Sequence, residues 1–340
     1  MLTLPEPSVA PLRGGPGLRW GVLGPGGIAH DWVSTLHRNT DQRVIAVASR
    51  SMERSRAFAD RHAIPHAFEG HEALLASADV DVVYVAAPHA QHRPLALAAI
   101  AAGKHVLIEK PMALDAIEAE QIAAAARAAG VFAMEAMWTR YLPQSDLIAR
   151  LLADGALGDV RTVTADLGWR WEFATGDPRF DPMVGGGVML DAGVYPLWFA
   201  HSILGSIDGV HAIGSIAPTT AEVEAVISLR SATGASASLT ASATATTPGL
   251  AAVYGTTGSV LFDSSFVFPA RLSVISDGRE HEWVDDSGLA GRDGLAWQAA
   301  ALAAYVAEGR MQSPLHSLDD SIAVLRVLDE VRRQIRSQAE

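Results

Sequence analysis

The sequence predicts an α/β protein with a doubly wound parallel sheet, followed by an α+β domain with an open, mostly antiparallel sheet. Three observations support this fold class. Strands alternate with helices from Leu18 to Glu135, the strand-like segments after Val160 mostly follow one another without crossover helices, and 340 residues are many for a single core. We therefore expect a flexible leader (1–17), a dinucleotide-binding domain (18–136), and a domain for substrate binding and oligomerisation (137–340).

The composition excludes several classes of function. The chain is 49% hydrophobic and 19% charged, with a formal net charge of −12 and no dense run of Lys or Arg. This argues against binding to nucleic acid or to an anionic membrane, and favours small-molecule partners. No apolar run is long enough to span a bilayer, and the Pro- and Gly-rich leader does not resemble a signal peptide. The absence of cysteine excludes disulfides and thiolate metal sites, and fits the cytoplasm.

The first ordered stretch combines a strand, a glycine turn and a helix. Trp20–Leu23 is a short buried strand, and the motif GxGxxA follows with Gly24, Gly26 and Ala29. The first glycine permits a tight turn, the second lets backbone N–H groups approach a pyrophosphate, and the small third residue packs the helix on the strand. This pattern predicts dinucleotide binding by a Rossmann domain.

The end of the second strand indicates which dinucleotide is bound. An NAD site is expected to place an Asp or Glu there, whereas Val44–Ala48 is followed by Ser49 and Arg50. Ser49, Arg50 and Arg54 suit a 2′-phosphate, so NADP is favoured over NAD. The alternative is that both arginines lie on a solvated helix start.

Two later strands end in candidate site residues. PHAQH follows the strand Val82–Ala86, and we expect its loop to lie beside the cofactor, because His89 and His92 lack the partners of a metal site. The strand His105–Ile108 runs into Glu-Lys-Pro, which directs Lys110 into the crevice expected for the nicotinamide. The alternative for Lys110 is an exposed loop lysine.

The chain changes character after the strand Val131–Glu135. The segment MWTRYLP contains Trp138 and Arg140, which could line a polar substrate pocket or could pack between domains. A helix, a long strand over Val160–Trp171 and an aromatic loop follow.

The loop leads into an apolar stretch, Gly185–Trp198, which we predict to be a helix. Asp191 and Tyr195 are four residues apart and therefore share one face. They form either a satisfied structural pair or part of a site. The glycines at its start would let the helix approach a cofactor or substrate.

The remaining segments predict the second sheet and its helices. Without crossover helices, strands pair antiparallel, and one face of such an open sheet needs a cover, for which self-association is the simplest explanation. The expected strands are 209–213, 221–229, 235–243, 251–254, 259–263, 266–275 and 280–284, and the final helices are 294–308 and 318–337.

Taken together, GxGxxA, Glu-Lys-Pro and GGGVMLDAGVYP resemble the Gfo/Idh/MocA oxidoreductase family. MEAMWTRYLP and a tyrosine at position 195 are most similar to the branch of dihydrodiol dehydrogenases, glucose-fructose oxidoreductase and NADP-linked xylose dehydrogenases. The resemblance implies that Lys110, Asp191 and Tyr195 meet at the nicotinamide as the catalytic residues. It also implies a homodimer or homotetramer formed through the second sheet.

On this basis Tyr195 is the expected general acid/base, assisted by Lys110 and Asp191. A phenol has a pKa of about 10, and a neighbouring ammonium group would lower it. We expect substrate contacts from Lys110, Trp138, Arg140, Trp171, Arg179, Asp191 and Tyr195. We expect cofactor contacts from Gly24, Pro25, Gly26, Gly27, Ile28, Ala29, Ser49, Arg50, Arg54, Ala87, Pro88, His89, His92, Glu109, Lys110, Glu135, Trp138 and Arg140, and no metal site.

The predicted function is an NADP-dependent oxidoreductase acting on a CH–OH group of a sugar, a sugar derivative or a cyclic vicinal diol. One alternative is a biosynthetic keto-sugar reductase with the same fold. Another is a non-catalytic protein that senses a sugar or NADP; the loss of the lysine or tyrosine would mark such a protein, and both are present.

Overall fold

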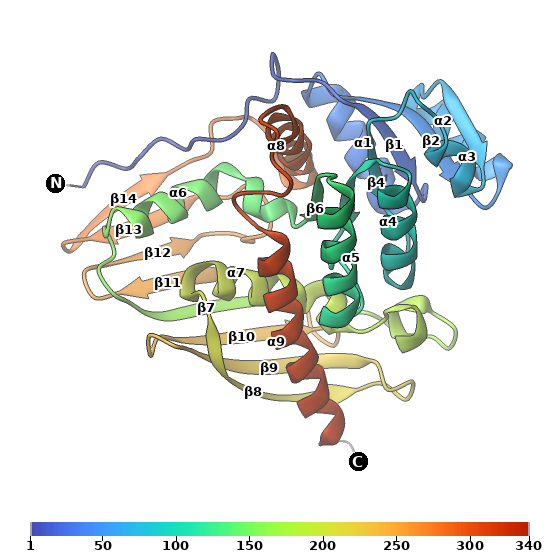
Figure 1. Cartoon of the computed structure of the whole chain (residues 1–340). Helices are drawn as coiled ribbons and strands as arrows, with labels where there is room; N and C mark the ends of the chain where they lie inside the picture. Colours follow the sequence, from blue (N-terminus) through green and yellow to red (C-terminus); the bar gives the residue numbers. More distant parts are fainter. Residues whose placement is uncertain (1, 339–340) are drawn as a thin grey trace. The chain divides into compact units, whose positions relative to one another are not determined.

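The computed structural model describes residues 2–338, which form two compact units (Figure 1). The parallel-sheet unit comprises residues 9–141 and 290–322. The mixed-sheet unit comprises residues 2–8, 142–289 and 323–338. Each unit has its own sheet and core, so two domains are present as predicted.

The parallel-sheet unit contains six parallel strands in the order β3-β2-β1-β4-β5-β6. Strands buried on both faces need continuous apolar runs, and β4 has the sequence VVYV with all four residues buried. The order reverses between β1 and β4, which is where doubly wound sheets bind ligands at their carboxyl edge. The strands are β1 (Arg19–Leu23), β2 (Arg43–Ser49), β3 (His66–Glu69), β4 (Val82–Val85), β5 (His105–Glu109) and β6 (Ala133–Ala136).

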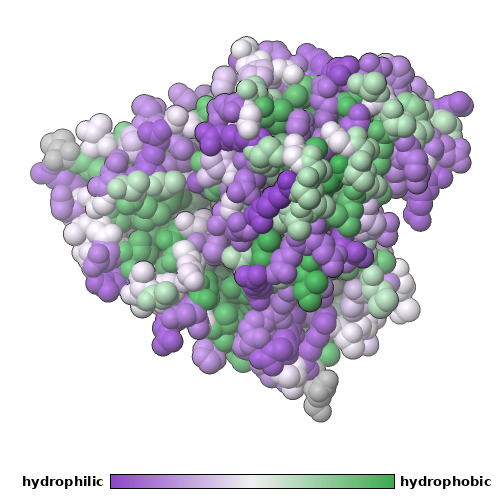
Figure 2. Space-filling model, viewed as in Figure 1, coloured by the Kyte–Doolittle hydropathy of each residue, from purple (hydrophilic) through white to green (hydrophobic). Residues whose placement is uncertain are grey.

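Helices connect these strands and supply the outer layers of the unit. Two of them, α4 and α5, expose alanines between their buried residues, which gives the pale green surface over these helices in Figure 2. Alanine therefore raises the hydrophobic content without requiring burial. The connecting helices are α1 (Gly27–Asn39), α2 (Met52–His62), α3 (His71–Leu75), α4 (His92–Ala101) and α5 (Ala116–Ala129).

The mixed-sheet unit contains eight strands in the order β14-β13-β12-β11-β7-β10-β9-β8. Every neighbouring pair is antiparallel except β7 and β10. The predicted open, mostly antiparallel sheet is thus confirmed. The strands are β7 (Val160–Gly168), β8 (Ile207–Ile216), β9 (Glu222–Ser231), β10 (Ser236–Ser242), β11 (Ala251–Gly255), β12 (Gly258–Phe262), β13 (Leu272–Ser276) and β14 (Arg279–Trp283).

Helices lie on one side of this sheet in Figure 1. They are α6 (Pro143–Ala153), α7 (Val194–Leu204) and the later turns of α9 (Leu318–Ser337). The other face carries alternate exposed side chains, for example Val226, Ser228 and Arg230 along β9. This alternation leaves one polar and partly apolar face of the sheet without a covering layer from the described residues of the chain.

The units do not follow the predicted boundaries, because residues 290–322 belong to the parallel-sheet unit. Their helix α8 (Ala296–Ala307) is apolar on most sides and packs on α1. The segment after it pairs with the edge of β6, where the Ala133 amide donates to Met311 O over 3.2 Å. A helical pattern shows that a face is buried, but not against which unit, so sequence reasoning assigned this segment to the second domain.

The predicted flexible leader also differs in the structure. It has no helix or strand over residues 2–17, yet Asp41 accepts hydrogen bonds from Gly14 N (2.7 Å) and Arg13 Nη1 (3.2 Å). Gln42 Nε2 donates to Pro16 O over 2.6 Å. These bonds hold residues 13–16 on the parallel-sheet unit.

No helix within residues 2–338 is both long enough and apolar enough to cross a membrane.

Candidate active site

The glycine motif lies between β1 and α1, where the strand order reverses. Gly24 has a φ of +97°, and a Cβ there would lie 2.7 Å from Ala86 O, so only glycine fits. Gly26 precedes α1 without any side-chain cap, and Gly27 faces open space. The first amides of α1 are therefore available to a phosphate. Pro25 and Ala29 are buried beneath this turn.

The end of β2 carries two exposed arginines and no acid. The side chains of Arg50 and Arg54 form no ion pair or hydrogen bond within the described part of the chain. The Ser49 side chain is buried and donates to Ser51 O over 2.7 Å, and its contact with a 2′-phosphate stays a prediction. Ser49 therefore shapes the turn that presents the arginines.

The end of β4 is fixed by a buried histidine. His92 is 0% exposed, with Nδ1 2.8 Å from Pro111 O and Nε2 2.9 Å from Ala87 O. Burial lowers the pKa of His92 to about 4, so the neutral ring has one N–H and donates to one of these carbonyls at a time. His92 thus connects the loops after β4 and β5, and its contact with a cofactor stays a prediction.

Lys110 follows directly after β5 and precedes a cis peptide bond to Pro111. Because β5 lies next to β4, and β4 next to β1, the loops carrying Lys110, Ala87 and Gly24 share one edge of the sheet. Beside it, Glu109 is buried, accepts hydrogen bonds from Tyr84 Oη and Lys110 N, and has its pKa raised to about 7 by burial. Glu109 thus holds the backbone of Lys110.

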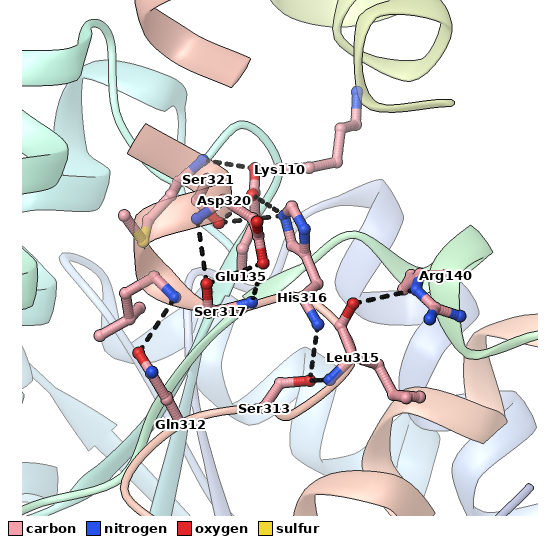
Figure 3. A network of polar contacts seen from close by, with 12 residues as sticks. Lys110, Glu135, Arg140, Gln312, Ser313, Leu315, His316, Ser317, Asp320 and Ser321 are labelled. Carbon is pink, nitrogen blue, oxygen red and sulfur yellow. Dashed lines mark hydrogen bonds and ion pairs between the residues drawn. The ribbon is translucent and has the colours of Figure 1, made fainter. Parts of the chain in front are cut away.

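The end of β6 is also occupied by a buried carboxylate. Glu135 accepts from Met112 N with one oxygen, and from His316 and Ser321 with the other (Figure 3). Its contact with a cofactor stays a prediction. In the following turn, Trp138 is buried and Arg140 Nε donates to Leu315 O over 3.0 Å. Their contacts with cofactor or substrate stay predictions.

The candidate residues Asp191 and Tyr195 lie in the mixed-sheet unit. The predicted helix begins at Val188 instead of Gly185, and Met189–Gly193 forms a π turn ahead of α7. Asp191 lies in that turn and is partly exposed, whereas Tyr195 is buried in the first turn of α7. Such π turns occur often at functional sites.

The glycines before this helix are required by contacts within the mixed-sheet unit. A Cβ on Gly186 would lie 2.5 Å from Pro178 O. Gly187 has a φ of +123°, and a Cβ there would lie 2.6 Å from Glu222 Oε2. The expected approach to a ligand is therefore not needed to explain them; the chain's own packing requires glycine.

An aromatic and charged cluster lies near Asp191 in the same unit. The Arg179 guanidinium lies 5.6 Å from the centre of the Trp171 ring, and Trp171 packs edge-on against Phe180. The hydrogen bond with Asp177 raises the pKa of Arg179, and the charge of Asp191 adds to this effect. Trp171 and Arg179, both predicted to bind substrate, are thus placed together.

Within residues 2–338, no group of three or more His, Cys, Asp or Glu side chains is placed to hold a metal ion.

A parallel sheet with a glycine turn at its switch point, joined to a second open sheet, is the architecture of two-domain oxidoreductases that use nicotinamide dinucleotides. Residues 18–137 match the model described as the oxidoreductase family with an NAD-binding Rossmann fold, and residues 146–261 match the GFO/IDH/MocA C-terminal domain. The chain therefore belongs to the Gfo/Idh/MocA family, and it is an enzyme of the oxidoreductase class.

Similar proteins include dehydrogenases and reductases. The chain is 31% identical over 326 residues to a trans-1,2-dihydrobenzene-1,2-diol dehydrogenase of Xenopus tropicalis, covering 93% of this chain and 98% of that protein. A 3-ketoreductase from Actinomadura kijaniata, solved with NADP and TDP-benzene, is 30% identical with a TM-score of 0.80, covering 94% of this chain and 98% of the other. An aldose-aldose oxidoreductase from Caulobacter crescentus, solved with glycerol, is 26% identical with a TM-score of 0.85, covering 95% and 98%.

Sequence reasoning missed the residues that hold these loops. His316 and Ser321 lie almost two hundred positions from Glu135 and belong to no motif that we recognised. The local signal that could have drawn attention to this segment is the spacing of Ser317 and Asp320, which cap α9. Glu222 carried no signal beyond being an acid in a strand.

Proposed function

We propose that this enzyme transfers a hydride between NADP and a carbinol or carbonyl carbon of a sugar, a sugar derivative or a cyclic vicinal diol. The observation that carries the proposal is the position of Lys110, after β5 at the same sheet edge as the glycine turn. The diol dehydrogenase relatives, and the neighbours solved with TDP-benzene or glycerol, support the substrate class.

The proposed mechanism assigns one proton and one hydride per turnover. When bound, the oxidised nicotinamide supplies the acceptor for the hydride that leaves the substrate carbon. Tyr195 takes the hydroxyl proton as the C–O bond becomes a carbonyl, and returns it in the reverse direction. Lys110 favours the phenolate form of Tyr195, and Asp191 orients Lys110 or a substrate hydroxyl. If so, Tyr195→Phe lowers the rate and flattens the alkaline limb of the pH–rate profile; an unchanged profile would exclude this role.

The role of Lys110 can be tested against an internal control, because the chain has only one other lysine, Lys104. Lys104 lies before β5, and its Nζ donates to Ser77 O and Val80 O. We expect Lys110→Met to lower kcat at least about a thousandfold while NADPH still binds, and Lys104→Met to retain the turnover of the folded enzyme. Turnover is measured by nicotinamide absorbance with dihydrodiols, pentoses and hexoses. A near-normal rate for Lys110→Met would contradict the proposal.

The preference for NADP rests on Arg50 and Arg54. A 2′-phosphate would pair with these exposed arginines, which have no partner within residues 2–338, at the position where an NAD enzyme places an acid. Removing a charged hydrogen bond of this kind costs about tenfold to a hundredfold in affinity. We expect that loss for NADPH but not for NADH in Arg50→Ala, measured by fluorescence titration. Arg170→Ala in the mixed-sheet unit is the control, and equal wild-type affinities for both cofactors would refute the preference.

A second candidate is physiological reduction of a keto-sugar, favoured by the similarity to the 3-ketoreductase. The direction follows from comparing kcat/KM for alcohol and ketone at equal pH. A non-catalytic sensor would bind cofactor without turnover on the whole substrate panel.

We further propose a homodimer or homotetramer formed through the uncovered face of the mixed sheet. The exposed fractions of Ile213 and Val226 are 64% and 44%, and these residues pair across β8 and β9 on that face. Burying such apolar side chains favours association. Val226→Lys is expected to shift the mass measured by light scattering toward the monomer, whereas a wild-type monomer would exclude the assembly.

A further inference from the structure

The loop that carries Lys110 is held by three buried, titratable side chains at three consecutive residues. Glu109 accepts from the Lys110 amide over 3.1 Å. His92 contacts the Pro111 carbonyl at 2.8 Å, and Glu135 accepts from the Met112 amide over 3.0 Å. Buried polar groups with several partners restrict a loop to one conformation, since any movement leaves a desolvated group unpaired.

Glu135 depends in turn on residues far along the chain. Its second oxygen, Oε2, accepts from Ser321 Oγ at 2.6 Å and lies 2.9 Å from His316 Nε2. Burial alone would raise the pKa of Glu135, but the hydrogen bonds from His316, Ser321 and Met112 outweigh it and lower the pKa. Glu135 therefore stays ionised, with both oxygens directed at these donors.

The cluster is not a hydrolytic triad. His316 presents the same atom, Nε2, to Glu135 and to Ser321, whereas a nucleophile relay uses both ring nitrogens. Glu135, His316 and Ser321 are 3%, 4% and 1% exposed, so no substrate reaches them. In Figure 3 the Lys110 side chain extends away from the cluster, so any effect on Lys110 passes through the backbone of its loop.

The segment that supplies His316 and Ser321 is itself fixed. Ser317 caps α9, with Asp320 N donating to Ser317 Oγ over 3.1 Å and Ser317 N donating to Asp320 Oδ2 over 2.8 Å. The His316 amide donates to Ser313 Oγ over 3.2 Å. The donors to Glu135 thus have defined positions independent of the Lys110 loop.

From these contacts we infer that His316 and Ser321 are positioning residues for hydride transfer. They hold Glu135, which binds the Met112 amide and thereby fixes the conformation of the loop that carries Lys110. The inference rests on the proposed function, because it requires that Lys110 act in turnover. It assigns a role to the segment 311–321, which lies outside both matched family domains.

The decisive experiment compares His316→Leu with His316→Gln. Leucine removes the donor to Glu135, whereas glutamine places an N–H close to the position of Nε2. We expect His316→Leu to lower kcat at least about tenfold, with KM and the NADPH dissociation constant within about twofold of wild type. His316→Gln is expected to recover most of the rate.

His105→Leu is the matched control. His105 Nδ1 accepts from the Phe132 amide at the other end of β5, whereas His316 donates to Glu135. We expect this variant to lose thermal stability without loss of kcat per folded molecule, so that a merely structural effect is recognisable. A wild-type kcat for folded His316→Leu, or equal losses for the leucine and glutamine variants, would overturn the inference.

If His316→Leu fails to fold, Ser321→Ala tests the same inference. It removes one donor from Glu135 and should lower kcat severalfold, whereas an unchanged rate would overturn the inference. The proposed function is judged separately: it fails if Lys110→Met is active. If Lys110→Met is inactive but the His316 and Ser321 variants keep the wild-type rate, only the positioning role fails.

Discussion

Each unit places a buried glutamate beside the segment that carries its candidate catalytic residues, but the two glutamates are held differently. Glu135 in the parallel-sheet unit uses both oxygens, toward Met112, His316 and Ser321. Glu222 in the mixed-sheet unit is 0% exposed and directs Oε1 toward Arg332 and Arg336, while Oε2 has no hydrogen-bond partner among the described residues. The first is held by directional hydrogen bonds, the second mainly by charge.

Because of this difference, the two glutamates constrain the chain segments beside them in different ways. Glu135 accepts from a backbone amide of the loop, so it fixes the direction of that loop. Glu222 meets Gly187 by close packing, since the space that a Cβ would fill lies 2.6 Å from Oε2. It therefore limits which residue can precede the π turn. Helix α9 supplies donors to both glutamates, with Ser321 in its first turn and Arg332 and Arg336 in its last turns.

The largest effect is expected at Glu222. Replacing it by alanine removes the carboxylate from its buried ion pair with the largely buried Arg332, and breaking a buried pair costs about 3–5 kcal/mol in the free energy of unfolding. We expect a value near the lower end, because Arg336 is 42% exposed and can turn to solvent. Urea denaturation measures the loss.

Glu224→Ala is the control for this prediction. Glu224 lies two residues further along β9 and accepts only a 3.3 Å hydrogen bond from Thr244. A difference below 1 kcal/mol between the two variants would mean that charge pairing does not hold Glu222.

Sequence patterns predicted the parts of this molecule that depend on neighbours in the chain. The turn at Gly24, the lysine after β5 and the helix with Asp191 and Tyr195 all follow from local spacing. Glu222 does not: alternation along β9 places it with the half-buried Glu224 and the exposed Val226 and Ser228. The pairing of β8 with β9 shifts register next to Ile216, opposite Glu222, and the side chain is buried. An irregularity in strand pairing cannot be read from one strand.

The same limit explains the residues at Glu135. The sequence shows an acid at the end of a buried strand, which suggested a cofactor contact. Its partners His316 and Ser321 come from a segment that sequence reasoning assigned to the other domain. Long-range polar contacts decide whether such an acid faces a ligand or the protein, and spacing contains no information about them.

A smaller effect is expected at Glu109, a third buried carboxyl whose pKa is shifted opposite to that of Glu135. Because its pKa is about 7 in the folded protein and 4.5 ordinarily, the folded state binds more protons between these values. The contribution of Glu109 to the free energy of unfolding therefore decreases by up to about 3 kcal/mol as pH rises from about 4.5 to about 7. Above pH 7 it stays constant.

Glu109→Gln removes this titration. The difference in unfolding free energy between variant and wild type, measured in urea at pH 5, 6, 7 and 8, should change up to pH 7 and then stay constant. A difference that is independent of pH would show that Glu109 is ionised throughout, like Glu135.

The smallest effect concerns Asp41, an exposed acid that also accepts from a backbone amide. The hydrogen bond from the Gly14 N–H, together with Arg13, lowers the pKa of Asp41. The ionised Asp41 therefore binds the leader at pH 7, and this binding is lost as pH falls through the lowered pKa. Solvent competes for such bonds, and we expect Asp41→Ala to leave the global unfolding midpoint unchanged. The local effect should be visible as severalfold faster trypsin cleavage after Arg13, because cleavage requires only local release of the segment. Equal cleavage rates in variant and wild type would show that an exposed carboxylate, unlike Glu135, cannot hold a loop through a backbone amide.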